Sequence, residues 1–183
     1  MKLTLIAALC AATLPFAAAQ AQGAESPDGS RAFGIEPYVG IGGGWHDFDT
    51  GNKGLLQTQG SAKGGLVTGF AGVNVPLGMF VVGAEGNVAK GFGDIDWEYG
   101  VTGHVGIRVG ESGMVFGRAG YQWVNTDIGD DRNELYGFGV EVGPKDIGLG
   151  GVTGESGVRL RLAVDTFDVF QSIRPTAAVV FHF

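Results

Sequence analysis

Hydrophobic and polar residues alternate along most of the chain after its first 32 residues. The alternation is clearest from Trp97 to Val109, where Val101 and Val105 lie on one face while Thr102 and His104 lie on the other. Side chains of a β-strand point alternately to its two faces, so a period of two indicates strands with one apolar face. The sequence therefore predicts a protein built from β-strands.

Eight such stretches follow one another, separated in turn by short turns and by longer polar segments, which is typical of antiparallel strands in sequence order. They run from Ile35 to Asp47, Gly64 to Val75, Phe80 to Ala89, Trp97 to Val109, Met114 to Val124, Tyr136 to Val142, Gly157 to Thr166 and Ile173 to Phe183. The predicted loops are Phe48 to Ala62, Lys90 to Asp96, Asn125 to Asn133 and Asp168 to Ser172. The glycine-rich segment from Pro144 to Ser156 fits neither pattern.

The apolar faces of these strands need a partner, and the composition points to lipid. The chain has 35 glycines and a slightly positive mean hydropathy, yet after the N-terminal region it has no apolar run long enough for a transmembrane helix. Strands can enter a bilayer only as a closed barrel, because closure gives every backbone N–H and C=O a partner. We predict an all-β fold, a transmembrane antiparallel up-and-down β-barrel of eight strands.

The N-terminus has the pattern of a secretory signal peptide. A basic Lys2 precedes an apolar run from Leu3 to Phe16 and then small residues that suit cleavage. We expect residues 1–22 to be removed, residues 23–32 to be flexible, and residues 33–183 to form the barrel. The single cysteine, Cys10, would leave with the signal peptide, which excludes a disulfide or a thiolate metal site. We expect no metal or cofactor, and the net charge of −7 argues against a nucleic-acid partner.

The polar faces of the predicted strands carry both acidic and basic side chains. Those on the inward parity that we single out are Glu85, His104, Arg108, Arg118, Glu141, Arg159, Arg161 and Asp165. An eight-stranded barrel is narrow enough for side chains to fill it, and unpaired buried charges cost several kcal/mol. We therefore expect a charged plug in the lumen. The alternative is a narrow porin-like channel for ions or small solutes.

Aromatic residues mark both the predicted membrane boundary and the C-terminus. Trp45, Trp97 and Trp123 fall on apolar faces at strand ends beside longer loops, as in an interfacial girdle on the outer-leaflet side. At the C-terminus, Val179, Phe181 and Phe183 share one face. This ending resembles the signal by which outer-membrane barrels are recognised by their assembly machinery.

The order and spacing of glycine-aromatic motifs resemble the small opacity-type barrels, and the plan is similar to the membrane domain of OmpA and to OmpX. The motifs are Tyr38-Val39-Gly40-Ile41-Gly42, Gly83-Ala84-Glu85-Gly86, Gly103-His104-Val105-Gly106, Gly117-Arg118-Ala119-Gly120-Tyr121 and Gly139-Val140-Glu141, with the terminal Phe183. The resemblance implies a Gram-negative outer membrane location, contact with lipid and lipopolysaccharide, and assembly by the barrel machinery. It also implies a structural or surface-interaction role, adhesin- or antigen-like, through extracellular loops.

An enzymatic role is the least favoured interpretation. Some small outer-membrane barrels modify lipid A, and one such class resembles a Ser-His-Glu hydrolase that faces the lipid. Here His46, His104 and His182 have inward parity, while Ser112 and Ser156 lie in predicted turns at the other side of the membrane. We therefore expect no catalytic residues. Acidic loop residues could instead be bridged by divalent cations to lipopolysaccharide phosphates; they are Asp49, Asp94, Asp96, Asp130 and Asp131.

Overall fold

The computed structural model describes residues 35–48, 62–93, 96–110, 112–126, 129–143, 157–167 and 172–183. These residues form β1 (Glu36–Phe48), β2 (Ala62–Leu77), β3 (Phe80–Gly93), β4 (Trp97–Val109), β5 (Gly113–Thr126), β6 (Gly129–Val142), β7 (Val158–Phe167) and β8 (Ser172–His182). All eight predicted strands are present. The predicted signal peptide, the N-terminal segment and the segment from Pro144 to Ser156 lie outside the described residues.

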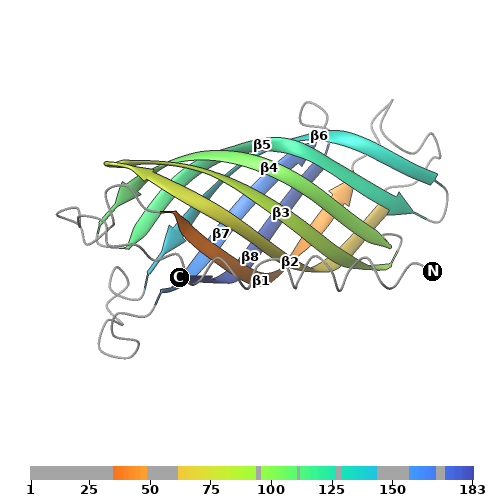
Figure 1. The fold of residues 1–183 in the computed structure, drawn as a ribbon. Coiled ribbons are helices and arrows are strands. Elements are labelled where there is room, and N and C mark those ends of the chain that lie inside the picture. The colour runs from red at the N-terminus through yellow and green to blue at the C-terminus, as the bar shows by residue number, and fades with distance from the viewer. Residues whose placement is uncertain are drawn as a thin grey trace, which may run out of the picture.

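The eight strands close into one barrel. Each strand pairs antiparallel with its neighbours in sequence, and β8 pairs antiparallel with β1 to complete the ring. Figure 1 shows the strands inclined to the long axis as they wrap around it. The predicted fold class, an antiparallel up-and-down barrel of eight strands, is confirmed. In the part of the chain that the structure describes, no helix is long and apolar enough to cross a membrane.

The two ends of the barrel differ. At the end that we call the turn end, β2 and β3 are joined through Gly78, and β4 leads toward β5 through Gly110; both glycines have positive φ, 69° and 71°, which a side chain would disfavour. Glu36, the first residue of β1, and His182, the last residue of β8, also lie at this end. We call the opposite end the loop end, where β1 ends at Phe48 and β8 begins at Ser172.

Three loop predictions need correction. The segment from Asn125 to Asn133 is mostly strand, because β5 continues to Thr126 and β6 starts at Gly129. Backbone pairing such as Asn125 with Asp130 extends this hairpin, and a ladder of N–H and C=O groups tolerates polar side chains at its end. Lys90 to Gly93 likewise belong to β3, and Ser172 belongs to β8. The predicted first loop lies largely outside the described residues, although Phe48 and Ala62 at its two ends are in β1 and β2.

Burial follows the predicted period of two. In β4 every second residue from Glu98 to Gly106 is buried, and the residues between them are exposed. The exposed side chains are largely apolar, for example Val105 at 58% and Phe138 at 65% exposure, while charged groups such as Glu85 and Asp165 are buried. The barrel is therefore apolar outside and polar inside.

The seam between β1 and β8 brings distant segments together. The register passes from Gly44 paired with Thr176 to Phe48 paired with Ser172. Gly44 packs tightly here, since a Cβ on it would lie 2.4 Å from the carbonyl oxygen of Pro175. This register places the start of β8 beside the end of β1 at the loop end.

Candidate functional site

The middle of the lumen holds a carboxylate between two guanidinium groups. Arg118 donates from Nε and Nη2 to the two oxygens of Asp165, each at 2.7 Å. Arg174 donates from Nη2 to Asp165 Oδ2 at 2.9 Å. The side chain of Asp165 is fully buried, so its charge is compensated by hydrogen-bonded cations rather than by solvent.

Nearer the turn end, Arg161 joins two glutamates. Its guanidinium donates from Nη1 to Glu85 and from Nε to Glu141 Oε1, the latter at 2.7 Å. Arg118 also reaches Glu85, at 3.3 Å, and the Tyr38 hydroxyl donates to Glu85 at 2.8 Å. The guanidinium of Arg161 lies 4.6 Å from the ring centroid of Phe70, a cation–π arrangement that suits a charge shielded from water.

At the loop end, three polar side chains from β1, β4 and β8 meet. His46 Nδ1 is 2.7 Å from Glu98 Oε1, and His46 Nε2 is 2.8 Å from Ser172 Oγ. The other oxygen of Glu98 accepts from Arg174 Nη1 at 2.6 Å. The ring of Phe167 packs against the imidazole, with centroids 4.8 Å apart. These contacts fix the position of the imidazole between the two other groups.

These contacts join into one continuous series that we call the interior network. In order from the loop end it comprises Ser172, His46, Glu98, Arg174, Asp165, Arg118, Glu85, Arg161, Glu141 and His182. Acidic and basic groups alternate along most of it. A cavity beside the network, lined by Glu85 and Arg174 among others, has a volume of about 20 Å³, which is room for a water molecule.

Glycines facing the lumen make room for the network. A Cβ at Gly137 would lie 2.2 Å from Asp165 Oδ1, and one at Gly72 would lie 2.4 Å from the hydroxyl oxygen of Tyr38. Outward-facing Gly117 has no such conflict, since its nearest neighbour would be 3.9 Å away. The high glycine content is thus partly explained by large polar side chains that occupy a narrow interior.

The structure places the eight predicted interior residues inside the barrel but does not bring all of them together. His104 Nε2 is hydrogen-bonded to Asn74 Oδ1 at 2.7 Å, and Arg108 Nη2 donates to Glu36 at 2.6 Å. His104 and Arg108 therefore lie outside the network. Arg159 lies beside Glu141, with 3.8 Å between Nη1 and Oε2. The other five predicted residues belong to the network.

Sequence reasoning did not single out four members or partners of the network: Glu98, Arg174, Ser172 and Tyr38. Parity alone could have found three of them. Glu98 shares the inward face of β4 with His104, Arg174 shares that of β8 with His182, and Tyr38 shares that of β1 with His46. The sequence pattern predicts a loop at Ser172, whereas the structure has it as the first residue of β8. In the described part of the chain, no group of three or more His, Cys, Asp or Glu side chains is arranged to hold a metal ion.

The three tryptophans lie on the outer surface toward the loop end. Trp45 is 52% exposed and Trp97 is 40% exposed, while the ring of Trp123 stacks on Tyr99 with centroids 5.6 Å apart. Val179, Phe181 and Phe183 also point outward, near the turn end. The girdle and the assembly signal stay predictions, since position alone does not test either role.

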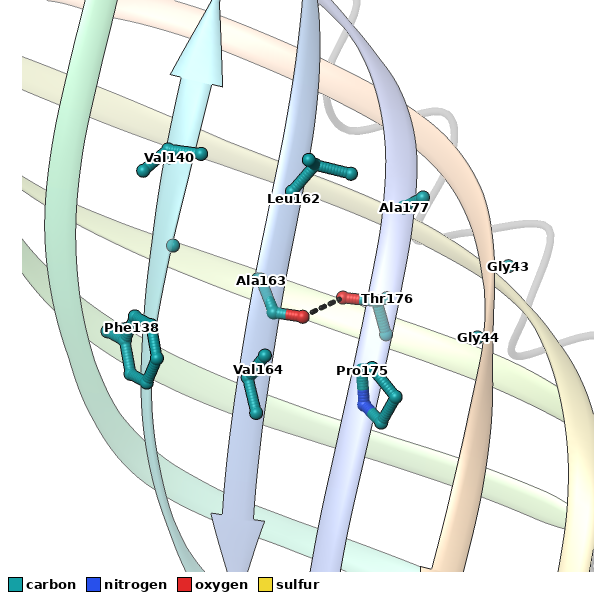
Figure 2. A pocket seen from close by; sticks show the side chains of 11 residues that line it. Gly43, Gly44, Phe138, Val140, Leu162, Ala163, Val164, Pro175, Thr176 and Ala177 are labelled. Atoms are coloured by element: carbon teal, nitrogen blue, oxygen red, sulfur yellow. Dashed lines mark hydrogen bonds between the residues drawn. The ribbon is translucent and has the colours of Figure 1, made fainter.

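The outer wall is hollowed over β6, β7, β8 and β1. The hollow has a volume of about 460 Å³. In Figure 2 it is bordered by Phe138, Val140 and Leu162, with Ala177 and Gly43 on its other side. The hydroxyl of Thr176, an inward-facing residue, donates to the carbonyl of Ala163 at 3.4 Å beneath it. The hollow is almost wholly apolar, as expected for a surface in contact with acyl chains.

In this closed ring of strands the exterior is apolar and the interior holds paired charges. This distribution of side chains is the reverse of that in a water-soluble protein. Exposed side chains such as Ile41, Val101 and Phe138 would face water over most of the wall if the barrel were in solution. In a bilayer the same wall faces lipid, and every strand finds its backbone partners within the ring. The protein is a transmembrane β-barrel of the outer-membrane type.

The comparisons with known proteins concern this architecture. No family model and no curated protein matches the chain. Among solved structures, the chain is similar to Neisserial surface protein A, with 13% identity, a TM-score of 0.46, and coverage of 82% of this chain and 99% of that one. It is also similar to Yersinia pestis Ail, the attachment invasion locus protein, with 15% identity, a TM-score of 0.44, and coverage of 81% and 98%.

Proposed function

We propose that this protein is a non-conducting outer-membrane surface barrel that acts through its loop end, in a structural or surface-interaction role of the adhesin or antigen kind. The observation that carries this proposal is the interior network, which crosses the lumen from Ser172 to His182 and leaves a cavity of about 20 Å³ beside it. A channel for ions or solutes needs a continuous aqueous path. The lumen is instead occupied by paired side chains.

Opening such a path would require separating buried ion pairs. The side chain of Arg161 forms ion pairs with both Glu85 and Glu141, and it is 4% exposed. Leaving a buried charge without its partner costs about 3–5 kcal/mol. The network therefore favours a sealed barrel, and we place the proposed surface-interaction role at its loop end.

The lumen is sealed and the wall faces lipid, so the loop end is the part available to extracellular partners. The outward tryptophans there suit contact with the lipid and lipopolysaccharide of the outer leaflet. Lys90, which pairs with Asp96, lies over the ring of Trp97 at 5.1 Å and adds a charged group at the same boundary. We propose that Phe183 and the outward residues before it serve assembly.

Surface presentation is tested by epitope insertion. A short tag inserted after Thr126, at the loop end, should be labelled by antibody on intact cells. The matched control carries the same tag after Gly110, at the turn end, and should be labelled only after the outer membrane is permeabilised. Labelling of the Gly110 insertion on intact cells, with none at Thr126, would refute the proposed orientation and the surface role with it.

A further inference from the structure

The contacts of Ser172, His46 and Glu98 have the geometry of a nucleophile, a base and an orienting acid. Ser172 Oγ lies 2.8 Å from His46 Nε2, and Glu98 Oε1 lies 2.7 Å from His46 Nδ1. The pairs are separated by 126 and 52 positions in sequence, so the closure of the barrel brings them together. Both ring nitrogens of one imidazole are used, one toward a hydroxyl and one toward a carboxylate, which is the pattern of serine hydrolases.

The charges in the lumen indicate the protonation state of His46. Within the described residues the network and its neighbour Arg159 contain four carboxylates and four guanidinium groups, which balance without a charged histidine. They are Glu85, Glu98, Glu141 and Asp165, with Arg118, Arg159, Arg161 and Arg174. A neutral His46 donates its Nδ1 proton to Glu98, since a carboxylate can only accept. Its Nε2 lone pair then accepts the proton of the Ser172 hydroxyl.

The surroundings hold this arrangement in place. Arg174 binds the second oxygen of Glu98 at 2.6 Å, so the carboxylate cannot turn away from the imidazole without losing an ion pair. Phe167 packs on the ring of His46, and His46 and Glu98 are fully buried. Ser172 is 5% exposed and is the first residue of β8 at the loop end. A base fixed by packing and two hydrogen bonds is preorganised for proton transfer.

We propose that Ser172 is a nucleophile with His46 as its general base and Glu98 as a positioning residue, and that the site takes a small, water-soluble acyl ester. This activity goes beyond the proposed surface role. The substrate would reach Ser172 from the loop end, because the rest of the network fills the lumen beneath it. In this proposal the acyl group is small because Ser172 lies on the inward face of β8, in a narrow lumen that side chains fill.

The chemistry needs no further reagent than water. Ser172 Oγ attacks the ester carbonyl carbon while His46 Nε2 takes the hydroxyl proton. The C–O bond to the alcohol then breaks, and the alcohol leaves with the proton from His46. Water, deprotonated by the same nitrogen, attacks the acyl-serine, and the acid is released as the Ser172 hydroxyl regains its proton. The sum is ester and water to acid and alcohol.

The test uses the folded full-length protein in micelles, with a fluorophosphonate probe and peptide mass spectrometry to locate the label. We expect labelling at Ser172, none in Ser172→Ala, and unchanged labelling in Ser112→Ala, a serine at the turn end. His46→Gln should slow labelling by about a hundredfold or more, as expected when a general base is lost. Each variant is first checked for heat-dependent gel migration, so that a misfolded sample is not counted.

Glu98→Gln separates a positioning role from a structural one. If Glu98 orients a neutral imidazole, this variant should keep the folded gel band while labelling slows and its dependence on pH changes. Folded wild-type protein without label at Ser172 would overturn the proposal, as would a labelling rate that His46→Gln leaves unchanged. Neither result would bear on whether the barrel is sealed.

Discussion

Arg118 binds Asp165 through two parallel hydrogen bonds of 2.7 Å inside the barrel, where the carboxylate is fully buried. The two residues come from β5 and β7, which lie on either side of β6 in the ring, so the pair bridges the inner face of β6. This contact links two strands that share no backbone hydrogen bonds with each other.

Removing this cation should destabilise the barrel strongly. Arg118→Met leaves Asp165 with Arg174 as its remaining partner in the network and removes a contact to Glu85. We expect the free energy of unfolding, measured with urea in lipid vesicles, to fall by about 3–5 kcal/mol. The control is Lys90→Met in the exposed pair with Asp96, which should cost less than about 1 kcal/mol. Equal losses in the two variants would contradict a stabilising network.

The space beside the same carboxylate gives a second prediction. Gly137→Ala places a methyl group 2.2 Å from Asp165 Oδ1 and should displace it, at a cost of about 1–3 kcal/mol in unfolding free energy. Gly117→Ala, on the outer face, meets no atom closer than 3.9 Å and should be close to neutral. A result in the opposite order would mean that the faces of β5 and β6 are assigned wrongly.

The lipid-facing wall of the barrel gives a third prediction. Leu162 points outward beside the hollow in Figure 2, so Leu162→Arg should lower stability in a bilayer by about 2–4 kcal/mol. Ile173→Arg is the matched outward substitution at the loop end, where the cost should be about 0–1 kcal/mol. Equal losses of unfolding free energy in lipid vesicles would indicate that Leu162 and Ile173 lie at the same depth in the bilayer.

The predicted assembly role of the terminal aromatic residue can be separated from stability. Phe183 is 61% exposed, and its backbone N–H donates to Pro37 at 3.0 Å. We expect Phe183→Ala to reduce the amount of folded barrel in cell outer membranes while refolding of the purified protein in detergent is unchanged. Ile35→Ala, another exposed apolar residue near the turn end, serves as the control. Loss of refolding in detergent would assign Phe183 a structural role instead.

The period of two predicted the number of strands and the inward face of residues such as Glu85 and Asp165, because both depend on local geometry alone. It did not predict the extent of the hairpin at Asn125, where backbone pairing continues through residues typical of loops. Nor could it predict which inward residues meet. The contact of His46 with Ser172 depends on the register of β8 against β1, which local patterning does not contain.

We propose that paired charges seal the lumen, and single-channel conductance of the refolded protein in a planar bilayer tests this sealing. Arg118→Ala and Glu85→Ala are measured alongside to perturb the network at its centre. We predict that the wild-type protein inserts and stays silent. Stepwise wild-type currents whose size changes in those two variants would contradict the sealed barrel and identify a narrow channel.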